Sequence, residues 1–126
     1  MSETKFSFED LEVWQKAVDF AVSVIDIVEI LNSDSNHYRL IEQIESSVTS
    51  ISVNIAEGKG RNSKKKFIQY LYIARGSLFE TITFITIFYK KKWISNSKLN
   101  DLRIEGDTIG KQLSSLINSI KQTITK

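Results

Sequence analysis

The chain has 126 residues, with 17 Lys and Arg against 15 Asp and Glu, and a formal net charge of +2 at pH 7. This length suits one domain, and the near-balance of charge excludes the bulk basic character of a protein that coats nucleic acid, so any basic site must be local. Cysteine is absent, which excludes disulfides, thiolate catalysis and cysteine-ligated metals. With no signal-peptide pattern and no apolar run of about 20 residues, we expect a soluble cytoplasmic protein that does not insert into a membrane.

The first predicted helix covers about residues 8–31 and carries two apolar stripes. It opens with the form of a capping box, in which Ser7 is the N-cap and Asp10 the third helical residue. One stripe runs from Leu11 to Val28, and the second lies about 100° further round. Because so broad an apolar surface needs more than one neighbour, we assign the second stripe to an oligomer interface made of Ala17, Phe20, Val24, Ile27 and Leu31.

A polar turn at 32–36 precedes a second predicted helix over about 38–57. The C-terminal half of this helix is rich in small hydroxyl residues instead of long charged ones. Such side chains let another surface approach closely, which fits either close helix packing or a ligand site, and packing is the simpler account. These residues are Ser46, Ser47, Thr49, Ser50 and Ser52.

The third and fourth predicted helices cover about 63–92 and 97–122, with Ser97 as the cap of the fourth. Glu80 interrupts an apolar stripe of the third helix, so its carboxylate needs a partner or water, and Asn54 is a candidate partner. We interpret Asn54, Glu57 and Glu80 as structural polar residues. Gly106 and Gly110 lie on adjacent turns of the fourth helix and suggest close contact with a neighbour. These four segments predict an all-α, up-and-down antiparallel four-helix bundle, a single domain over 1–126.

The segment joining the second and third helices carries the main charge signal. Gly58 is expected as a left-handed C′ residue and Ser63 as an N-cap. The following lysines stand in the first helical turn, where the helix dipole disfavours positive charge. In an up-and-down bundle this pole also collects Lys121 and Lys126, together with several acids. The candidate nucleic-acid-binding residues are Lys59, Arg61, Lys64, Lys65 and Lys66.

Two interpretations of this pole stay open. The lysines either form a solvated helix start or bind phosphate, which would be attracted by both the side chains and the free N–H groups. The run from Lys90 to Lys92 differs, because it closes a helix, where positive charge is the default.

No catalytic constellation is recognisable. His37 is the single histidine and falls in a turn, so neither a di-iron nor a zinc site has its ligands. Ser77 lies in mid-helix without a nucleophile elbow, and the glycines at 58 and 60 do not form a Walker loop. We therefore predict a protein that is not an enzyme, with no metal and no cofactor.

Three ordered motifs resemble the family of proteins encoded in intervening sequences of bacterial 23S rRNA genes. Phe8 to Ala17 is similar to the opening of that family, and Ser50-Ile51 through Asn54-Ile55-Ala56-Glu57-Gly58 to its most specific motif. The spacing Phe67-x-x-x-Leu71-x-Ile73-Ala74-x-Gly76-Ser77-x-x-Glu80 matches its third helix. The resemblance covers nearly the whole chain.

This resemblance implies a bundle that forms a ring-shaped homopentamer without known catalysis. The related accessory variability protein of diversity-generating retroelements is a pentamer of the same kind that engages nucleic acid and a reverse transcriptase. One departure is that Glu45-Ser46 follows Gln43-Ile44 where many relatives carry consecutive arginines. This removes positive charge from a face that the family can use.

The leading hypothesis is a non-enzymatic homo-oligomer whose basic pole contacts RNA or DNA. The competing hypothesis is a protein-interaction scaffold whose basic pole docks an acidic protein partner. An enzyme acting through Glu80 and Asn54 comes last, because it would need both groups to open onto a pocket.

Overall fold

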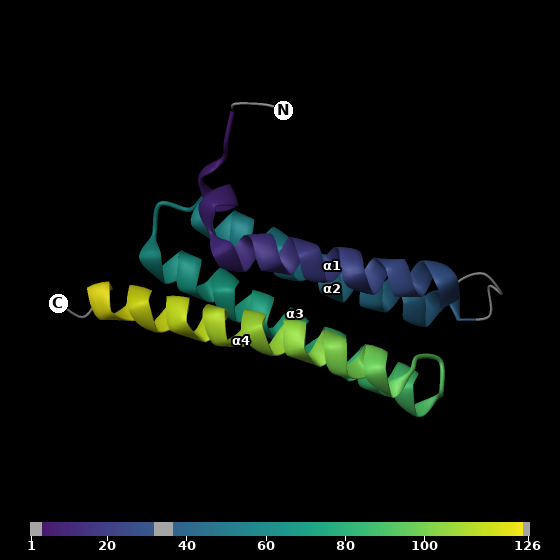
Figure 1. Ribbon diagram of the computed structural model, residues 1–126. Coiled ribbons are helices and arrows are strands. Elements are labelled where there is room, and N and C mark those ends of the chain that lie inside the picture. Colours follow the sequence, from purple (N-terminus) through teal and green to yellow (C-terminus); the bar gives the residue numbers. More distant parts are fainter. Residues whose placement is uncertain (1–3, 32–36, 125–126) are drawn as a thin grey trace.

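The computed structural model describes residues 4–31 and 37–124 and contains one short 3-10 helix and four α-helices. Each α-helix packs against two others, α1 on α2, α2 on α3, α3 on α4 and α4 on α1, which closes an up-and-down bundle (Figure 1). The predicted all-α four-helix fold is confirmed. The predicted polar turn at 32–36 and Lys126 lie outside the described residues. The elements are η1 Ser7–Asp10, α1 Glu12–Leu31, α2 Tyr38–Lys59, α3 Lys64–Lys90 and α4 Asn96–Ile124.

The core takes a different stripe of α1 from the predicted one. Ala17, Phe20 and Val24 are almost completely buried within the single chain, so they have no surface to offer a second subunit. Their assignment to an oligomer interface is therefore wrong. Ile27 and Leu31 are half-buried and pack against the same core. The error arose because two apolar stripes at equal spacing carry no signal for which one faces inward.

The start of α1 also differs from the predicted capping box. Ser7–Asp10 form η1, Leu11 is extended, and α1 begins at Glu12. Aromatic packing accounts for this turn, because the Phe8 ring lies edge-on to Trp14 with ring centres 5.2 Å apart. The Gln15 side chain then donates a 2.7 Å hydrogen bond to the Glu9 carbonyl, which ties η1 to the helix.

Buried hydroxyl groups join α2 to α3. Ser47 and Thr81 share a 2.8 Å hydrogen bond, and the Ser77 hydroxyl donates to Ser50 at 2.9 Å. Since a buried hydroxyl without a partner is costly, these pairs both permit and fix a close approach of the two helices. Close helix packing is thus the role of Ser47 and Ser50, and Ser77 is a packing residue as predicted.

The end of α2 packs closely against α3 at Gly58. Gly58 is buried and helical, not left-handed, and α2 ends at Lys59 with Gly60 as C-cap at φ −77°. A Cβ at position 58 would lie 2.7 Å from Cβ of Tyr70 and 2.9 Å from Cδ1 of Phe67. Glycine is needed here for space against α3, so the prediction of a left-handed residue was wrong.

The caps of the last two helices were predicted with mixed success. Ser63 caps α3, because its hydroxyl accepts the Lys66 N–H at 3.3 Å, as expected. At α4 the cap is Ser95, whose hydroxyl accepts the Lys98 N–H at 3.1 Å, and not Ser97. Gly106 does face a neighbour, since a Cβ there would lie 2.8 Å from Cδ1 of Ile82.

One helix in the described part of the chain, α3, is long and apolar enough to cross a membrane by length and composition. This criterion is also met by core helices of soluble bundles. In the bundle α3 buries one face, which includes Leu71, Ala74, Leu78 and Ile85, and leaves Ile73 and Phe79 more than half exposed. The helix therefore carries more apolar surface than one chain covers.

Candidate nucleic-acid interface

The basic pole lies at the end of the bundle where α1 begins, α2 turns into α3 and α4 ends (Figure 1). Lys59 closes α2, and Lys64 to Lys66 form the first turn of α3 after the Ser63 cap. All four lysines are exposed. The structure thus brings together the residues that sequence analysis singled out.

Three acids of this pole, Asp10, Glu12 and Glu57, are engaged by other cations, whereas Glu9 has no side-chain ion pair among the described residues. Lys5 pairs with Asp10 at 3.3 Å and Lys16 with Glu12 at 3.9 Å. Glu57 pairs with Arg61 at 3.3 Å. Within residues 4–31 and 37–124, the side chains of Lys59, Lys64, Lys65 and Lys66 make no ion pair and no hydrogen bond. Their charge is therefore left for an outside anion.

Arg61 is held within the protein and differs from the lysines. Its guanidinium donates to the Tyr70 hydroxyl at 2.8 Å and lies 5.1 Å from the centre of the same ring, in addition to the bond with Glu57. These contacts brace the loop between α2 and α3. Arg61 is thus placed to hold the lysines in position more than to bind directly.

Lys121, near the end of α4, extends the basic pole toward α3. Its ammonium donates to the Tyr72 hydroxyl at 2.7 Å and lies 5.2 Å from that ring's centre. This hydrogen bond, with smaller contributions from the charges of Lys121 and Arg75, lowers the pKa of the exposed Tyr72 phenol. The contact ties the end of α4 to α3.

The predicted structural polar residues do not act as a set. Asn54 donates to both the carbonyl and the hydroxyl of Ser50, each at 2.8 Å, and so belongs to the α2–α3 hydroxyl contacts. Glu80 is exposed on the outer side of α3, so the expected interruption of a buried stripe does not occur. The Asn54–Glu80 pairing was wrong, because the stripe that contains Glu80 faces outward.

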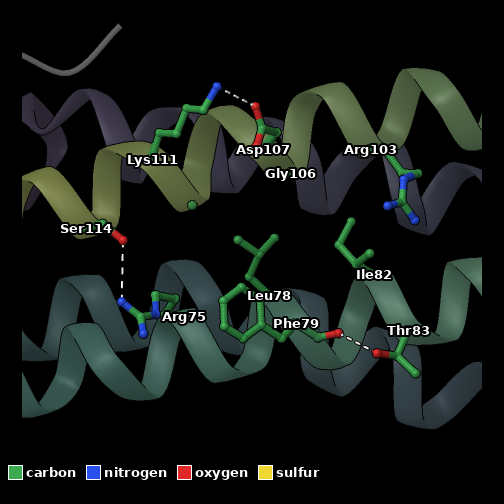
Figure 2. Close-up of a pocket in the computed structure, with 11 residues that line it drawn as sticks. Arg75, Leu78, Phe79, Ile82, Thr83, Arg103, Gly106, Asp107, Lys111 and Ser114 are labelled. Carbon is green, nitrogen blue, oxygen red and sulfur yellow. Dashed lines mark hydrogen bonds and ion pairs between the residues drawn. The ribbon is translucent and has the colours of Figure 1, made fainter.

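A groove of about 680 Å³ runs between α3 and α4, away from the basic pole. Leu78, Phe79 and Ile82 point into it from α3, and opposite them Gly106 has no side chain (Figure 2). Arg75 donates to Ser114 at 3.4 Å at one end, and Lys111 pairs with Asp107 at 2.9 Å on the rim (Figure 2). The lining holds one carboxylate, Asp107, and no histidine. The groove suits a packing partner.

No group of three or more histidine, cysteine, aspartate or glutamate side chains is placed to hold a metal ion among the residues that the structure describes. His37 stacks on Trp93 with ring centres 4.1 Å apart. This contact and those of Arg61 with Tyr70 and Lys121 with Tyr72 were not predicted. His37 and Lys121 contact residues far away in the sequence, which leaves no local pattern, whereas Arg61 lies in the loop only nine residues before Tyr70.

The fold and the pole define a helical-bundle protein with a local cationic end. The family model described as 23S rRNA-intervening sequence protein matches residues 9–115. The chain therefore belongs to the 23S rRNA-intervening sequence protein family.

A solved structure supports this membership. The chain is similar to a protein of unknown function from the S23 ribosomal protein family of Bacteroides thetaiotaomicron VPI-5482, with 27% sequence identity and a TM-score of 0.80. The match covers 84% of this chain and 95% of the other. A comparison with curated proteins found no match.

Proposed function

We propose that this protein is a non-enzymatic, homo-oligomeric bundle that binds RNA through its basic pole in the cytoplasm. The observation that carries the proposal is the contrast within the pole: three of its acids, Asp10, Glu12 and Glu57, are paired with Lys5, Lys16 and Arg61, while four neighbouring lysines have no partner in the described chain. The family's link with rRNA genes favours RNA over DNA as the ligand. The relation to the retroelement accessory protein stays a prediction from the resemblance.

The electrostatics of the pole favour phosphate. Three of the unpaired lysines stand where the helix dipole of α3 is already positive, so they cost some helix stability in the free protein. A bound phosphate would be stabilised by their ammonium groups and by the dipole together. Each phosphate contact releases counterions from the nucleic acid, so binding should weaken steeply with salt.

The experiment compares unpaired with paired lysines at the same pole. Lys64→Gln/Lys65→Gln and Lys5→Gln/Lys16→Gln remove equal charge, and both are measured by fluorescence anisotropy with a labelled RNA hairpin. The salt slope is the slope of the logarithm of the binding constant against the logarithm of salt concentration. We expect this slope to be about two units shallower in the first variant than in the wild type, and unchanged in the second. Equal losses in both variants would mean that only net charge matters. Competition by a polyglutamate peptide as effective as that by RNA would favour the scaffold hypothesis instead.

Self-association is the second part of the proposal, and of the predicted interface residues its surfaces keep only Ile27. The α3–α4 groove has an apolar lining with a rim that carries Arg75, Arg103 and Lys111. A smaller hollow between α1 and α4 combines Ile27 and Ile30 with acids, and Ile30 is 74% exposed. The acids of this α1–α4 hollow are Asp26, Asp101 and Glu105.

These two surfaces are complementary in charge and both contain apolar groups. They lie on neighbouring sides of the bundle, since each is bordered by α4. A contact between unlike surfaces is heterologous, and repeated copies then close into a ring when the rotation allows. We therefore propose that the α1–α4 hollow of one copy meets the α3–α4 groove of the next. The number of five copies is taken from the resemblance.

The test of self-association uses two exposed apolar residues of similar exposure. Phe79, 57% exposed, lines the groove, whereas Val53, 56% exposed, lies on α2. We expect Phe79→Ser to reduce the mass in light scattering to that of a monomer with unchanged helicity, and Val53→Ser to keep the wild-type mass. A monomeric wild type at micromolar concentration, or an unchanged mass for Phe79→Ser, would contradict this interface.

A further inference from the structure

The turn between α3 and α4 lies at the end of the bundle opposite the basic pole (Figure 1). Its side chains surround a hollow. It has a volume of about 500 Å³. We call it the turn hollow, and its lining residues are Tyr89, Lys90, Lys92, Trp93, Ile94 and Ser95. No acid occurs among these lining residues, and Lys90 and Lys92 are exposed on its rim.

The backbone of this turn has one unusual feature. Lys92 adopts a left-handed conformation with φ 66°, the one non-glycine residue with positive φ in the described chain. The Trp93 N–H donates to the Phe88 carbonyl and the Lys92 N–H to the Tyr89 carbonyl, each at 2.9 Å. This is the Schellman pattern, in which glycine is the usual residue at the left-handed position. A lysine at this position makes the folded protein less stable than a glycine would.

The dipole of α3 explains only one of the two lysines on the rim of the turn hollow. Positive charge at the end of α3 accounts for Lys90, but charge could be added there on any residue with ordinary φ. Keeping a lysine at the left-handed position instead of glycine points to a use for its ammonium group. Within the described residues, neither Lys90 nor Lys92 has a side-chain ion pair or hydrogen bond.

The wall of the turn hollow is aromatic. Trp93 is fixed in place, because its ring packs against His37 at 4.1 Å and Phe88 at 5.1 Å between centres. Tyr89 is 36% exposed at the mouth. Cations next to accessible aromatic rings, with no acid between them, match the chemistry of single-stranded nucleic acid, whose phosphates pair with lysine and whose bases stack on aromatic side chains.

We propose that the turn hollow is a second nucleic-acid contact, which takes an unpaired nucleotide of single-stranded RNA. The base lies against Tyr89 beside Trp93, and the adjacent phosphate is bound by Lys90 and Lys92. The contact goes beyond the proposed function, because it lies at the opposite pole and selects an unpaired base. An acidic peptide would satisfy the lysines but would leave the aromatic wall unused.

The test follows the fluorescence of Trp93 as an eight-nucleotide uridine RNA is added. Trp14→Phe is the background for every variant, because it leaves Trp93 as the only tryptophan of the sequence. We expect quenching that saturates and weakens as salt rises. Tyr89→Ala should weaken binding about tenfold, as loss of one stacked base does.

Two substitutions of Lys92 separate a structural from a binding role. Lys92→Gly should raise the melting temperature by roughly 3 °C and weaken RNA binding several-fold. Lys92→Arg keeps the charge and should retain wild-type affinity without the gain in melting temperature. Unchanged affinity in Lys92→Gly, or polyglutamate that quenches Trp93 as strongly as the RNA, would overturn the proposal.

The quenching of Trp93 should not depend on RNA binding at the basic pole. Lys64→Gln/Lys65→Gln should still show full quenching by the uridine RNA, even if the same variant loses the RNA hairpin. Quenching that disappears in this variant would overturn the turn hollow as a separate contact. Failure of hairpin binding in the wild type, with quenching intact, would contradict the proposed basic pole alone.

Discussion

Glu105 is a single residue through which pH should affect stability. Burial between α1 and α4 raises the pKa of its carboxyl, as do Asp101 and Asp19 nearby, although the Ser23 hydroxyl, 3.3 Å away, and Lys98 oppose this. Because the folded pKa lies above the unfolded one, the native state binds the proton more tightly. The stabilisation is complete below the unfolded pKa and is lost as pH rises through the folded value.

A neutral side chain at this position should remove the pH effect. We expect Glu105→Gln to melt at a higher temperature than the wild type at neutral pH, because it avoids the buried charge. The advantage should disappear at about pH 4, where the wild-type carboxyl is largely protonated in both states. Thermal melts at both pH values check this, and an equal difference at both would mean that the proton is not involved.

Gly58 provides a second test at the residue scale. We expect Gly58→Ala to destabilise the fold by about 1–3 kcal/mol, because the new Cβ would overlap Cβ of Tyr70, which cannot move without the α3 backbone. Gly76→Ala is the matched control, since nothing lies within 4 Å of its Cβ position. That variant should gain about 1 kcal/mol from helix propensity. Urea denaturation of both measures the contrast, and a stable Gly58→Ala variant would argue against the close helix contact.

At the scale of elements, the start of α4 gives the clearest prediction. Ser95→Ala should cost about 1 kcal/mol, because it removes the acceptor of the Lys98 N–H, whereas Ser97→Ala should be nearly neutral. Chemical denaturation of the two variants measures the difference. Equal stabilities would show that Ser95 does not act as the cap.

The helices themselves were largely predictable, because their apolar periodicity is long and uninterrupted by proline. Which face of each helix lies in the core was harder to predict. In α1 the two stripes have equal spacing, and only contact with the other helices shows that Phe20 is inside. The burial of the stripe around Glu80 was wrongly predicted for the same reason, since its apolar neighbours Ile73 and Ile87 are exposed on the outer side of α3.

The candidate site was predictable to the extent that it is local in sequence. Lys59 and Lys64 to Lys66 lie on one connection, so topology alone brings them to one pole. The contacts around these lysines are also short in sequence, since Arg61 lies nine residues before Tyr70 and Lys16 pairs with Glu12 one helical turn away. Whether such side chains meet depends on their rotamers, which the sequence pattern does not specify.

At the scale of the whole molecule, exposed lysines lie at both ends of the bundle, and two of its sides have the complementary charge that we propose for self-association. In a ring, four unpaired lysines per copy would be repeated around one face, which raises affinity without any new contact. Dilution to monomer should therefore weaken RNA binding at the pole by more than the loss of one site. Anisotropy titrations of wild type and the monomeric Phe79→Ser variant compare the two states directly, and equal affinities would separate binding from assembly.

The measurement that tests the central claim most directly is the salt dependence of binding to an RNA hairpin. It compares the wild type with a variant in which Lys59, Lys64, Lys65 and Lys66 are all replaced by glutamine. Four phosphate contacts per chain at the basic pole predict that the slope of the logarithm of the binding constant against the logarithm of salt concentration is about 3 to 4 units steeper in the wild type than in the variant. A wild type that does not bind at low salt, or a variant that keeps the wild-type slope, would contradict the account.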